Sequence, residues 1–143
     1  CEAAKWFRKA AEQGRSSAQC NLAICYFEGR GVEKDMEKGM FWYRKAAEQG
    51  FSDAICNIGW CYEFGQGVDR DLTLAAEWYR KAAEQGHPSA QCSLGWLYES
   101  GKGVPMDYQK ALCWYHKAAD QGFGRGYFSI GLCYENGHGY PVD

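Results

Sequence analysis

The sequence has no excess of charge of one sign and no long apolar run. Its 143 residues include 16 basic and 18 acidic side chains, which are interspersed and leave a net charge of -2. This balance argues against a nucleic-acid-binding stripe and against a polybasic patch that binds membranes. No apolar run is long enough to span a membrane, and no charged start followed by an apolar core has the pattern of a signal peptide. We therefore expect no nucleic-acid partner and no membrane insertion.

The motifs of common enzyme and cofactor sites are also missing. No Ser-x-x-Lys occurs, and no nucleophile lies at a useful spacing from a base. The Gly-x-Gly segments lack the strand-to-helix setting and the Lys-Ser/Thr of a phosphate-binding loop, although three have a basic middle residue: Arg30, Lys102 and His138. Cys113 and His116 lie three apart, but a zinc site needs four ligands and no second pair has this spacing. We expect no enzyme activity, no catalytic residue, no metal site and no cofactor.

The sequence does contain a regular internal repeat. The segment WYRKAAEQG occupies residues 42–50 and again 78–86, and the variants WFRKAAEQG and WYHKAADQG occupy residues 6–14 and 114–122. Each copy begins 36 residues after the previous one. A fixed period of this length is typical of proteins built from stacked supersecondary units.

Each repeat has the pattern of two helices separated by a glycine-containing loop. In the repeat that ends with the second WYRKAAEQG, Ala54, Ile58 and Tyr62 share one helical face, and Gly65 suits a left-handed helix end. Asp71 can then cap a second helix by accepting backbone N–H bonds. The equivalent positions predict helices over residues 1–13, 17–28, 35–49, 53–64, 71–85, 89–100, 107–121 and 125–136.

These helices predict an all-α fold, an α/α superhelix (solenoid) of antiparallel helix pairs with a 36-residue repeat. Stability should come from stacking, because one repeat cannot bury its apolar face alone. We expect one array with a partial repeat at each end, so that the chain is a fragment of a longer array or packs its ends against another copy. The expected boundaries are 1–14 (partial), 15–50, 51–86 and 87–122 (full), and 123–143 (partial).

Two positions depart from the repeat pattern in the first full repeat. Gly39 stands where Ala75 and Ala111 occur one and two periods later, and Ala23 stands where the later repeats have glycine. Glycine is about 1 kcal/mol less favourable than alanine inside a helix. We therefore expect Gly39 to loosen the helix over residues 35–49.

The combined pattern resembles the Sel1-like repeat. It recurs in register along the whole chain and consists, in its second full copy, of Ala54, Asn57-Ile58-Gly59, Tyr62, Gly65-Gln66-Gly67-Val68, Asp71 and Trp78 to Gly86. The resemblance implies a relative of tetratricopeptide repeats, whose helix pairs stack into a right-handed superhelix. It also implies a non-catalytic scaffold or adaptor that binds a protein or peptide, without naming the partner.

The resemblance to tetratricopeptide grooves places a partner on the concave face, which the first helix of each repeat lines. Apolar residues with two tryptophans would make the floor, and glutamates would make an acidic edge. Exposed aromatic floors of this kind are usually recognition sites. The predicted partner-binding residues are Cys20, Cys56, Cys92 and Phe128; Ile24, Trp60, Trp96 and Leu132; Phe27, Glu63, Glu99 and Glu135; and Asn21 and Asn57.

Other interpretations of these residues stay open. Asn21 and Asn57 match an asparagine with which related repeats hold a bound peptide, but they could equally bond within their own repeats. At this position the last two repeats have Ser93 and Ser129. The two tryptophans could be packed between helices as core. The lysines with which some relatives clamp a carboxylate are not evident, so a basic or apolar peptide suits the acidic edge better.

Two other functions compete with peptide binding. The array could be an architectural spacer, or it could self-associate through its ends. Some cysteine-rich relatives carry β-lactamase or hydrolase labels, which makes a hydrolase of that branch a remote alternative.

Six of the eight cysteines fall on the predicted first helices of the repeats. Cys20 and Cys25 point to different sides of one helix, and equivalent cysteines of successive repeats should be about 8–10 Å apart, beyond the reach of a disulfide. The resemblance implies, for the cysteine-rich secreted branch, a bridge between a second helix and the following first helix. Alanine fills that second-helix position here, as Ala47, Ala83 and Ala119. We expect buried free thiols, which favour a reducing, cytoplasmic location; the localisation is otherwise unknown.

Overall fold

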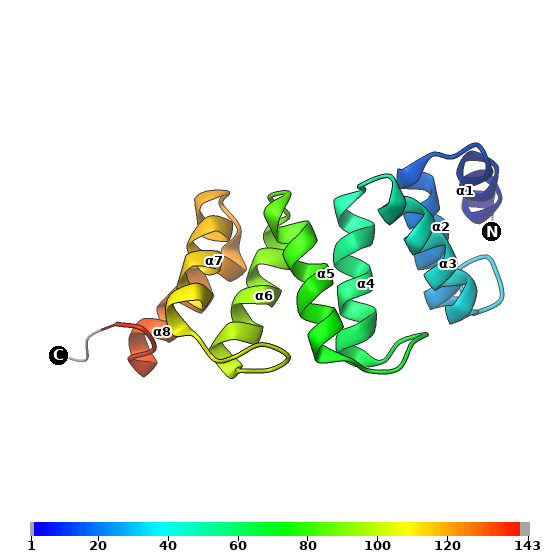
Figure 1. The fold of residues 1–143 in the computed structure, drawn as a ribbon. Helices are drawn as coiled ribbons and strands as arrows, with labels where there is room; N and C mark the ends of the chain where they lie inside the picture. The colour runs from blue at the N-terminus through cyan, green and yellow to red at the C-terminus, as the bar shows by residue number, and fades with distance from the viewer. Residues whose placement is uncertain (1, 141–143) are drawn as a thin grey trace. The chain divides into compact units, whose positions relative to one another are not determined.

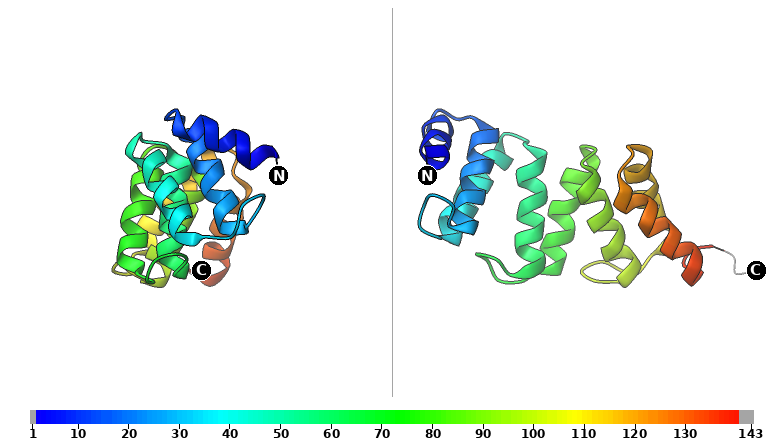
Figure 2. Two further views of the ribbon diagram at one scale, coloured as in Figure 1. Left: turned by 90° about the vertical axis from the view of Figure 1, so that its right-hand side faces the viewer. Right: turned by 180° about the vertical axis from the view of Figure 1, so that it is seen from behind.

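The computed structural model describes residues 2–140, which form eight α-helices and no β-strand. The chain divides into two compact units, and the boundary in the sequence lies between Arg70 and Asp71. In each unit the helices run alternately in opposite directions, and each packs against the next (Figures 1 and 2). The first unit contains α1 (Glu2–Glu12), α2 (Ser16–Glu28), α3 (Met36–Glu48) and α4 (Ser52–Phe64). The second unit contains α5 (Leu72–Glu84), α6 (Pro88–Ser100), α7 (Tyr108–Asp120) and α8 (Gly124–Asn136).

The helices begin and end at the residues that the local sequence favours. Helices α3, α5 and α7 each follow an aspartate that caps them; the Asp71 carboxylate accepts a hydrogen bond of 3.0 Å from the backbone N–H of Leu74. Helices α2, α4, α6 and α8 each end at a glycine with positive φ, such as Gly65 with a φ of 65°. A side chain would strain the backbone there. The predicted all-α fold of repeated helix pairs is confirmed.

Alanine and tyrosine build much of the core in each unit. Ala82 and Ala118, on α5 and α7, are fully buried, and their small side chains let neighbouring helices approach closely. Tyr79 and Tyr115 fill the wider gaps and are 2% and 1% exposed. Burying a side chain of this size contributes about 1.5–3 kcal/mol. The nonapeptide of the repeat is therefore mainly a packing motif.

A buried glutamine in each unit joins consecutive helices, and the sequence analysis did not predict it. Gln19 on α2 donates to the Ala11 carbonyl oxygen of α1 at 3.2 Å and accepts a 2.9 Å hydrogen bond from Gln49. Gln91 on α6 has the equivalent partners in the second unit. Leaving a buried amide without a partner costs about 1–3 kcal/mol. These bonds therefore favour one alignment of α1 with α2, and of α5 with α6.

Candidate functional site

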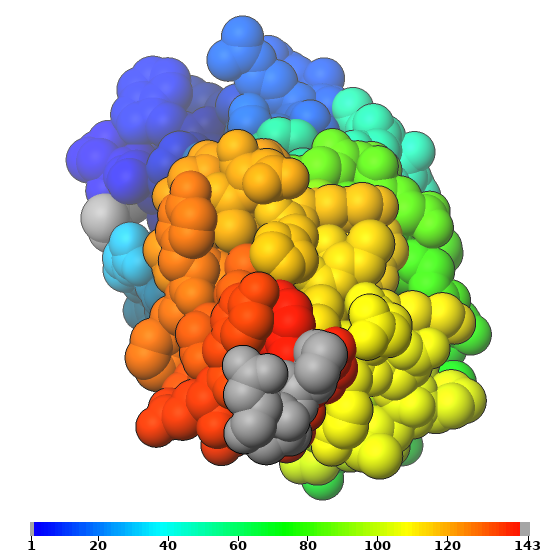
Figure 3. Space-filling view, turned by 90° about the vertical axis from the view of Figure 1, so that its left-hand side faces the viewer, coloured from blue at the N-terminus to red at the C-terminus, as the bar shows by residue number. Residues whose placement is uncertain are grey.

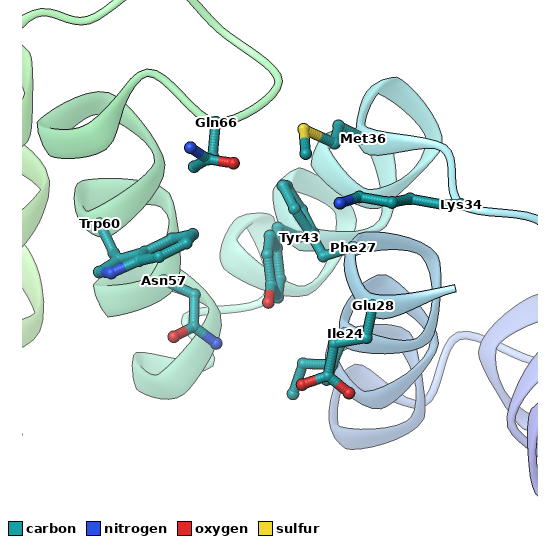
Figure 4. Close-up of a pocket in the computed structure, with 9 residues that line it drawn as sticks. All are labelled: Ile24, Phe27, Glu28, Lys34, Met36, Tyr43, Asn57, Trp60 and Gln66. Atoms are coloured by element: carbon teal, nitrogen blue, oxygen red, sulfur yellow. The ribbon is translucent and has the colours of Figure 1, made fainter. Parts of the chain in front are cut away.

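A pocket of about 470 Å³ opens in the first unit between α2, α3 and α4 (Figure 4). Its volume falls within the roughly 300–1,000 Å³ that is typical of ligand sites. Helices α2 and α4 supply two sides, and α3 with the loop before it supplies the third. The lining residues are Ile24, Phe27, Glu28, Lys34, Met36, Tyr43, Asn57, Trp60 and Gln66.

Aromatic rings form the wall of this pocket. The rings of Phe27 and Tyr43 stack with their centroids 5.3 Å apart and an interplanar angle of 25°. The Trp60 ring extends toward them from α4, and 45% of the residue is exposed (Figure 4). Burial raises the pKa of the Tyr43 hydroxyl above its usual range, so this group stays neutral at physiological pH. The wall is therefore uncharged, mostly apolar and open to solvent at Trp60.

Gly39 on α3 explains how the Phe27 ring reaches its position. A Cβ atom at residue 39 would lie 2.6 Å from two ring carbons of Phe27 and 3.3 Å from the Ala23 carbonyl oxygen. Alanine at this position would therefore push the ring away from α3. The prediction that Gly39 simply loosens its helix was incomplete, because helix propensity takes no account of a side chain from the neighbouring helix.

Polar groups surround the apolar wall. The Asn57 side-chain amide donates a weak hydrogen bond to the Cys20 sulfur at 3.8 Å. Glu28 forms an ion pair with Arg30 in the same unit. Lys34 is exposed beside the pocket. The pocket is thus lined by one acidic and one basic side chain, whose formal charges cancel.

The pocket brings together four of the predicted partner-binding residues, namely Ile24, Phe27, Asn57 and Trp60. Asn21 on α2 is exposed and Glu63 on α4 is half-buried, and neither lines the pocket. Cys20, Cys56 and Cys92 are only 3%, 7% and 0% exposed. At this burial they cannot contact a partner, which corrects the inclusion of the three cysteines in the binding surface.

The equivalent place in the second unit, 72 residues later, carries polar groups that are hydrogen-bonded to the Glu99 carboxylate. The Glu99 carboxylate accepts a 2.7 Å hydrogen bond from the Tyr115 hydroxyl and lies 2.9 Å from Nδ1 of His138. The His138 ring stacks on that of Tyr108 with centroids 4.5 Å apart. Burial, reinforced by the bond to Glu99, raises the pKa of Tyr115 above its usual range. Glu99 therefore holds the loop after α8 in place and is not a free acidic edge, a role that the sequence analysis missed because it treated His138 only as a loop charge.

The other predicted residues of the second unit differ in exposure. Trp96 on α6 is half-buried. Phe128 and Leu132 on α8 are 67% and 38% exposed, and Glu135 is exposed on the same helix. Figure 3 shows α8, in orange to red, at the surface of this unit. Trp60 belongs to the first unit and Trp96 to the second, and a floor shared by both remains a prediction.

The six cysteines of α2, α4, α6 and α8 are buried, as predicted for small apolar side chains. Burial is the main cause that raises the pKa of Cys20 and Cys133 to about 11 and that of Cys61 to about 12. These thiols therefore stay protonated near neutral pH and are poor nucleophiles. Cys113 on α7 is exposed. The cysteines of residues 2–140 form no disulfide with one another, and Cys1 lies outside the described residues.

The Gly-x-Gly loops have a packing role in both units. A Cβ atom at Gly67 would lie 2.9 Å from the Met36 carbonyl oxygen, and one at Gly103 would lie 2.1 Å from that of Leu72. The second glycine therefore allows the loop after α4 to touch the start of α3, and the loop after α6 to touch the start of α5. Within the described part of the chain, no group of three or more His, Cys, Asp or Glu gathers as a metal site requires. No helix there is long and apolar enough to cross a membrane.

The fold defines the class of the protein as a helical solenoid, built from helix pairs of about 36 residues. The Sel1 repeat family matches residues 2–14, 16–51, 52–87, 88–123 and 125–143. The chain therefore belongs to the Sel1-repeat family. Proteins with these repeats are generally protein-interaction scaffolds and typically lack enzymatic activity.

Solved structures of bacterial Sel1-repeat proteins are similar to this chain. The protective antigen c5321 of uropathogenic Escherichia coli is 39% identical with a TM-score of 0.94, over 98% of this chain and 30% of that one. A Sel1 repeat protein from Oxalobacter formigenes is 44% identical with a TM-score of 0.84, over 90% of this chain and 51% of that one. Cysteine-rich protein B of Helicobacter pylori is 25% identical with a TM-score of 0.69, over 86% of this chain and 93% of that one. The chain thus spans about a third of the length of the Escherichia coli protein and about half of the length of the Oxalobacter formigenes protein. A comparison with curated proteins finds no match.

Proposed function

We propose that this chain is a non-catalytic interaction module that binds a peptide segment of a partner protein at the pocket of the first unit. The observation that carries the proposal is the open pocket of about 470 Å³ with Phe27, Tyr43 and Trp60 in its lining. Trp60 is the anchor for the peptide, and the Asn57 amide bonds its backbone. The general role of Sel1 repeats as interaction scaffolds supports this assignment.

The exposed area of Trp60 gives an estimate of its contribution to the binding free energy. Covering the 45% of Trp60 that is exposed removes roughly 100 Å² of apolar surface from water, which at about 25 cal/mol/Å² stabilises a complex by ~2.5 kcal/mol. This is the size of contribution that makes a residue a hot spot at a protein interface. The Asn57 side-chain amide orients the bound peptide, because it can donate and accept hydrogen bonds beyond its weak bond to Cys20.

The test starts with peptides selected from a phage-displayed random library on the immobilised protein. We expect Trp60→Ala to weaken the selected peptides at least tenfold, because it removes most of the contact area estimated above. Trp6→Ala is the matched control, since Trp6 is 60% exposed in the same unit and lies outside the pocket lining. Circular dichroism checks that both variants keep the helicity of the parent. Failure to select any peptide, or selected peptides that bind Trp60→Ala as tightly as the parent, would refute the proposal.

The predicted contribution of the second unit is tested in the same assay. If Trp96 takes part, Trp60→Ala/Trp96→Ala should abolish binding that Trp60→Ala only weakens. Equal affinities for the single and double variants would restrict the site to the first unit.

One observation favours self-association as a second candidate function. On α8, Tyr127, Phe128 and Tyr134 are 60%, 67% and 60% exposed. Of the three equivalents of Tyr134, Tyr26 and Tyr98 are 8% and 7% exposed and Tyr62 is half-buried. An apolar face of this kind suits a second copy of the chain. Light scattering over a range of protein concentrations tests it: a mass that rises with concentration, and that Phe128→Ser keeps constant, supports self-association.

The comparisons give no support to the remote hydrolase alternative. The raised pKa values of the buried Cys20, Cys61 and Cys133 thiols also make them unsuitable as nucleophiles near neutral pH.

A further inference from the structure

We infer that the pocket of the first unit accepts a single bulky, uncharged side chain of an extended peptide, of the leucine, methionine or phenylalanine class. Phe27 and Gly39 determine this specificity by making the wall apolar. The inference rests on the proposed function and specifies which side chain the peptide inserts.

The second unit contains an equivalent site with which the pocket of the first unit can be compared. A shift of 72 residues relates the two units, and it pairs Phe27 with Glu99 and Gly39 with Ala111. The same tyrosine lies beside both sites, as Tyr43 and Tyr115. In the second unit the glutamate accepts a 2.7 Å hydrogen bond from this tyrosine. In the first unit the phenylalanine ring stacks on the tyrosine ring instead, with centroids 5.3 Å apart.

The position of the Phe27 ring requires glycine at residue 39 for a steric reason. The ring carbons of Phe27 occupy the space that a Cβ atom of residue 39 would need, 2.6 Å away. Ala111 keeps its Cβ in the second unit, where the carboxylate Glu99 stands at the position of the Phe27 ring. The pair of exchanges therefore puts an aromatic ring in the first unit where the second unit has the carboxylate that bonds Tyr115.

The remaining lining favours an uncharged ligand. Glu28 and Lys34 have opposite charges, and Glu28 is already paired with Arg30. No lining carboxylate is therefore free to balance a buried ammonium, and burying a charge without a partner is costly. Lys34 is exposed, and solvent screens its charge, so it pairs only weakly with a carboxylate. Ile24 and Met36 add further apolar surface. An aliphatic or aromatic side chain can lie between the Phe27 and Trp60 rings, while the Asn57 amide bonds the adjacent peptide backbone.

Figure 4 shows how the lining side chains are arranged around the pocket. The Trp60 ring and the Phe27 and Tyr43 rings lie on opposite sides of the pocket, and Asn57 lies one turn of α4 before Trp60. The lining residues come from different helices and loops of one unit.

The experiment selects phage-displayed random peptides on the parent protein and on Phe27→Glu/Gly39→Ala, which imports the residues of the second unit. Parent-selected peptides should share one leucine, methionine or phenylalanine. Replacing that residue by lysine or glutamate should weaken binding at least tenfold in fluorescence anisotropy, more than replacement by another apolar residue. The double variant should lose this preference and favour a lysine or arginine at the same position. Trp6→Ala again serves as the control that changes neither affinity nor preference.

The outcomes separate this inference from the proposed function. If no peptide binds the parent, the proposed function fails and the inference fails with it. If parent-selected peptides depend on Trp60 but share a charged residue, or the double variant selects the same peptides as the parent, the inference alone fails. Phe27→Ala provides a second test if the double variant loses helicity. It enlarges the pocket and should shift selection toward larger uncharged side chains, and an unchanged selection would overturn the inference.

Discussion

Replacing Gly39 by alanine tests whether the pocket wall depends on the absence of a Cβ atom. On helix propensity alone this substitution stabilises α3 by about 1 kcal/mol. The packing opposes that gain, because the new methyl group would lie 2.6 Å from Cδ2 and Cε2 of Phe27 and 3.3 Å from the Ala23 carbonyl oxygen. Adding a methyl group to filled space costs roughly 1–3 kcal/mol. We therefore expect Gly39→Ala to lower the free energy of unfolding by roughly 0–2 kcal/mol instead of raising it.

The effect should change sign when the ring is removed. In a Phe27→Ala background, Gly39→Ala should stabilise the protein by up to about 1 kcal/mol. The clash with the ring is then gone, and only the 3.3 Å approach to the Ala23 carbonyl oxygen opposes the helix-propensity gain. The two backgrounds then differ by a coupling energy of roughly 1–3 kcal/mol. Ala111→Gly is the matched control at the equivalent position of α7. It should cost about 1 kcal/mol or more whether Phe27 is present or not.

Urea unfolding followed by circular dichroism measures these differences in the parent, the two single variants and the double variant. The same proteins can be assayed with the peptides selected above, and Gly39→Ala should weaken them because the displaced Phe27 ring enters the pocket. A stabilisation of about 1 kcal/mol by Gly39→Ala in both backgrounds would refute the steric argument. Phe27 would then not be held against α3, and the described pocket wall would be wrong.

Three further predictions concern groups outside the pocket. Tyr115→Phe removes the hydroxyl that donates to the Glu99 carboxylate at 2.7 Å and should lower the free energy of unfolding by about 1.5–3 kcal/mol in urea denaturation. Among the described cysteines, Cys113 alone should react with a thiol reagent in the folded protein. Because burial raises the pKa of Cys61 from 9.0 to about 12, the fold favours its protonated thiol. Stability should therefore fall as pH rises from about 9 toward 12, and Cys61→Ala should reduce this loss.

Each of these predictions has a control and a contradicting result. Tyr43→Phe is the control for Tyr115→Phe, since Phe27 stands where the second unit has Glu99, and equal losses in the two variants would contradict the role of the carboxylate. A thiol count without reductant should rise to 8, the number of cysteines in the sequence, when the protein is denatured. A count several short of that would reveal disulfides. Alkylation of Cys61 in the folded protein as fast as Cys113 would contradict its burial.

Much of the helical architecture was predictable from the sequence. The helix predicted over residues 53–64 is Ser52–Phe64 in the structure, and the one predicted over 71–85 is Leu72–Glu84. These limits were predictable because caps and helix-ending glycines act within a few residues of the chain. The 36-residue period then assigned the same elements to each repeat.

The pocket was predictable only in part. The resemblance identified Phe27 and Trp60 as surface candidates, but it also included Cys20, which the structure buries. It did not identify Met36 or Tyr43, which come from α3 and line the same pocket. Whether a helical position is exposed depends on how closely the next helix packs. The sequence periodicity of one helix does not predict this distance between helices.

The period, the helices and their ends follow from the amino-acid sequence alone, because backbone hydrogen bonds and caps are local interactions. Which departures from the repeat matter depends instead on contacts between helices. Phe27 meets Gly39 across two helices, and Glu99 meets His138 although 39 residues separate them. Such contacts depend on the distances between packed helices. The same repeated pattern therefore yields an apolar pocket in one unit and a polar cluster hydrogen-bonded to the Glu99 carboxylate in the other.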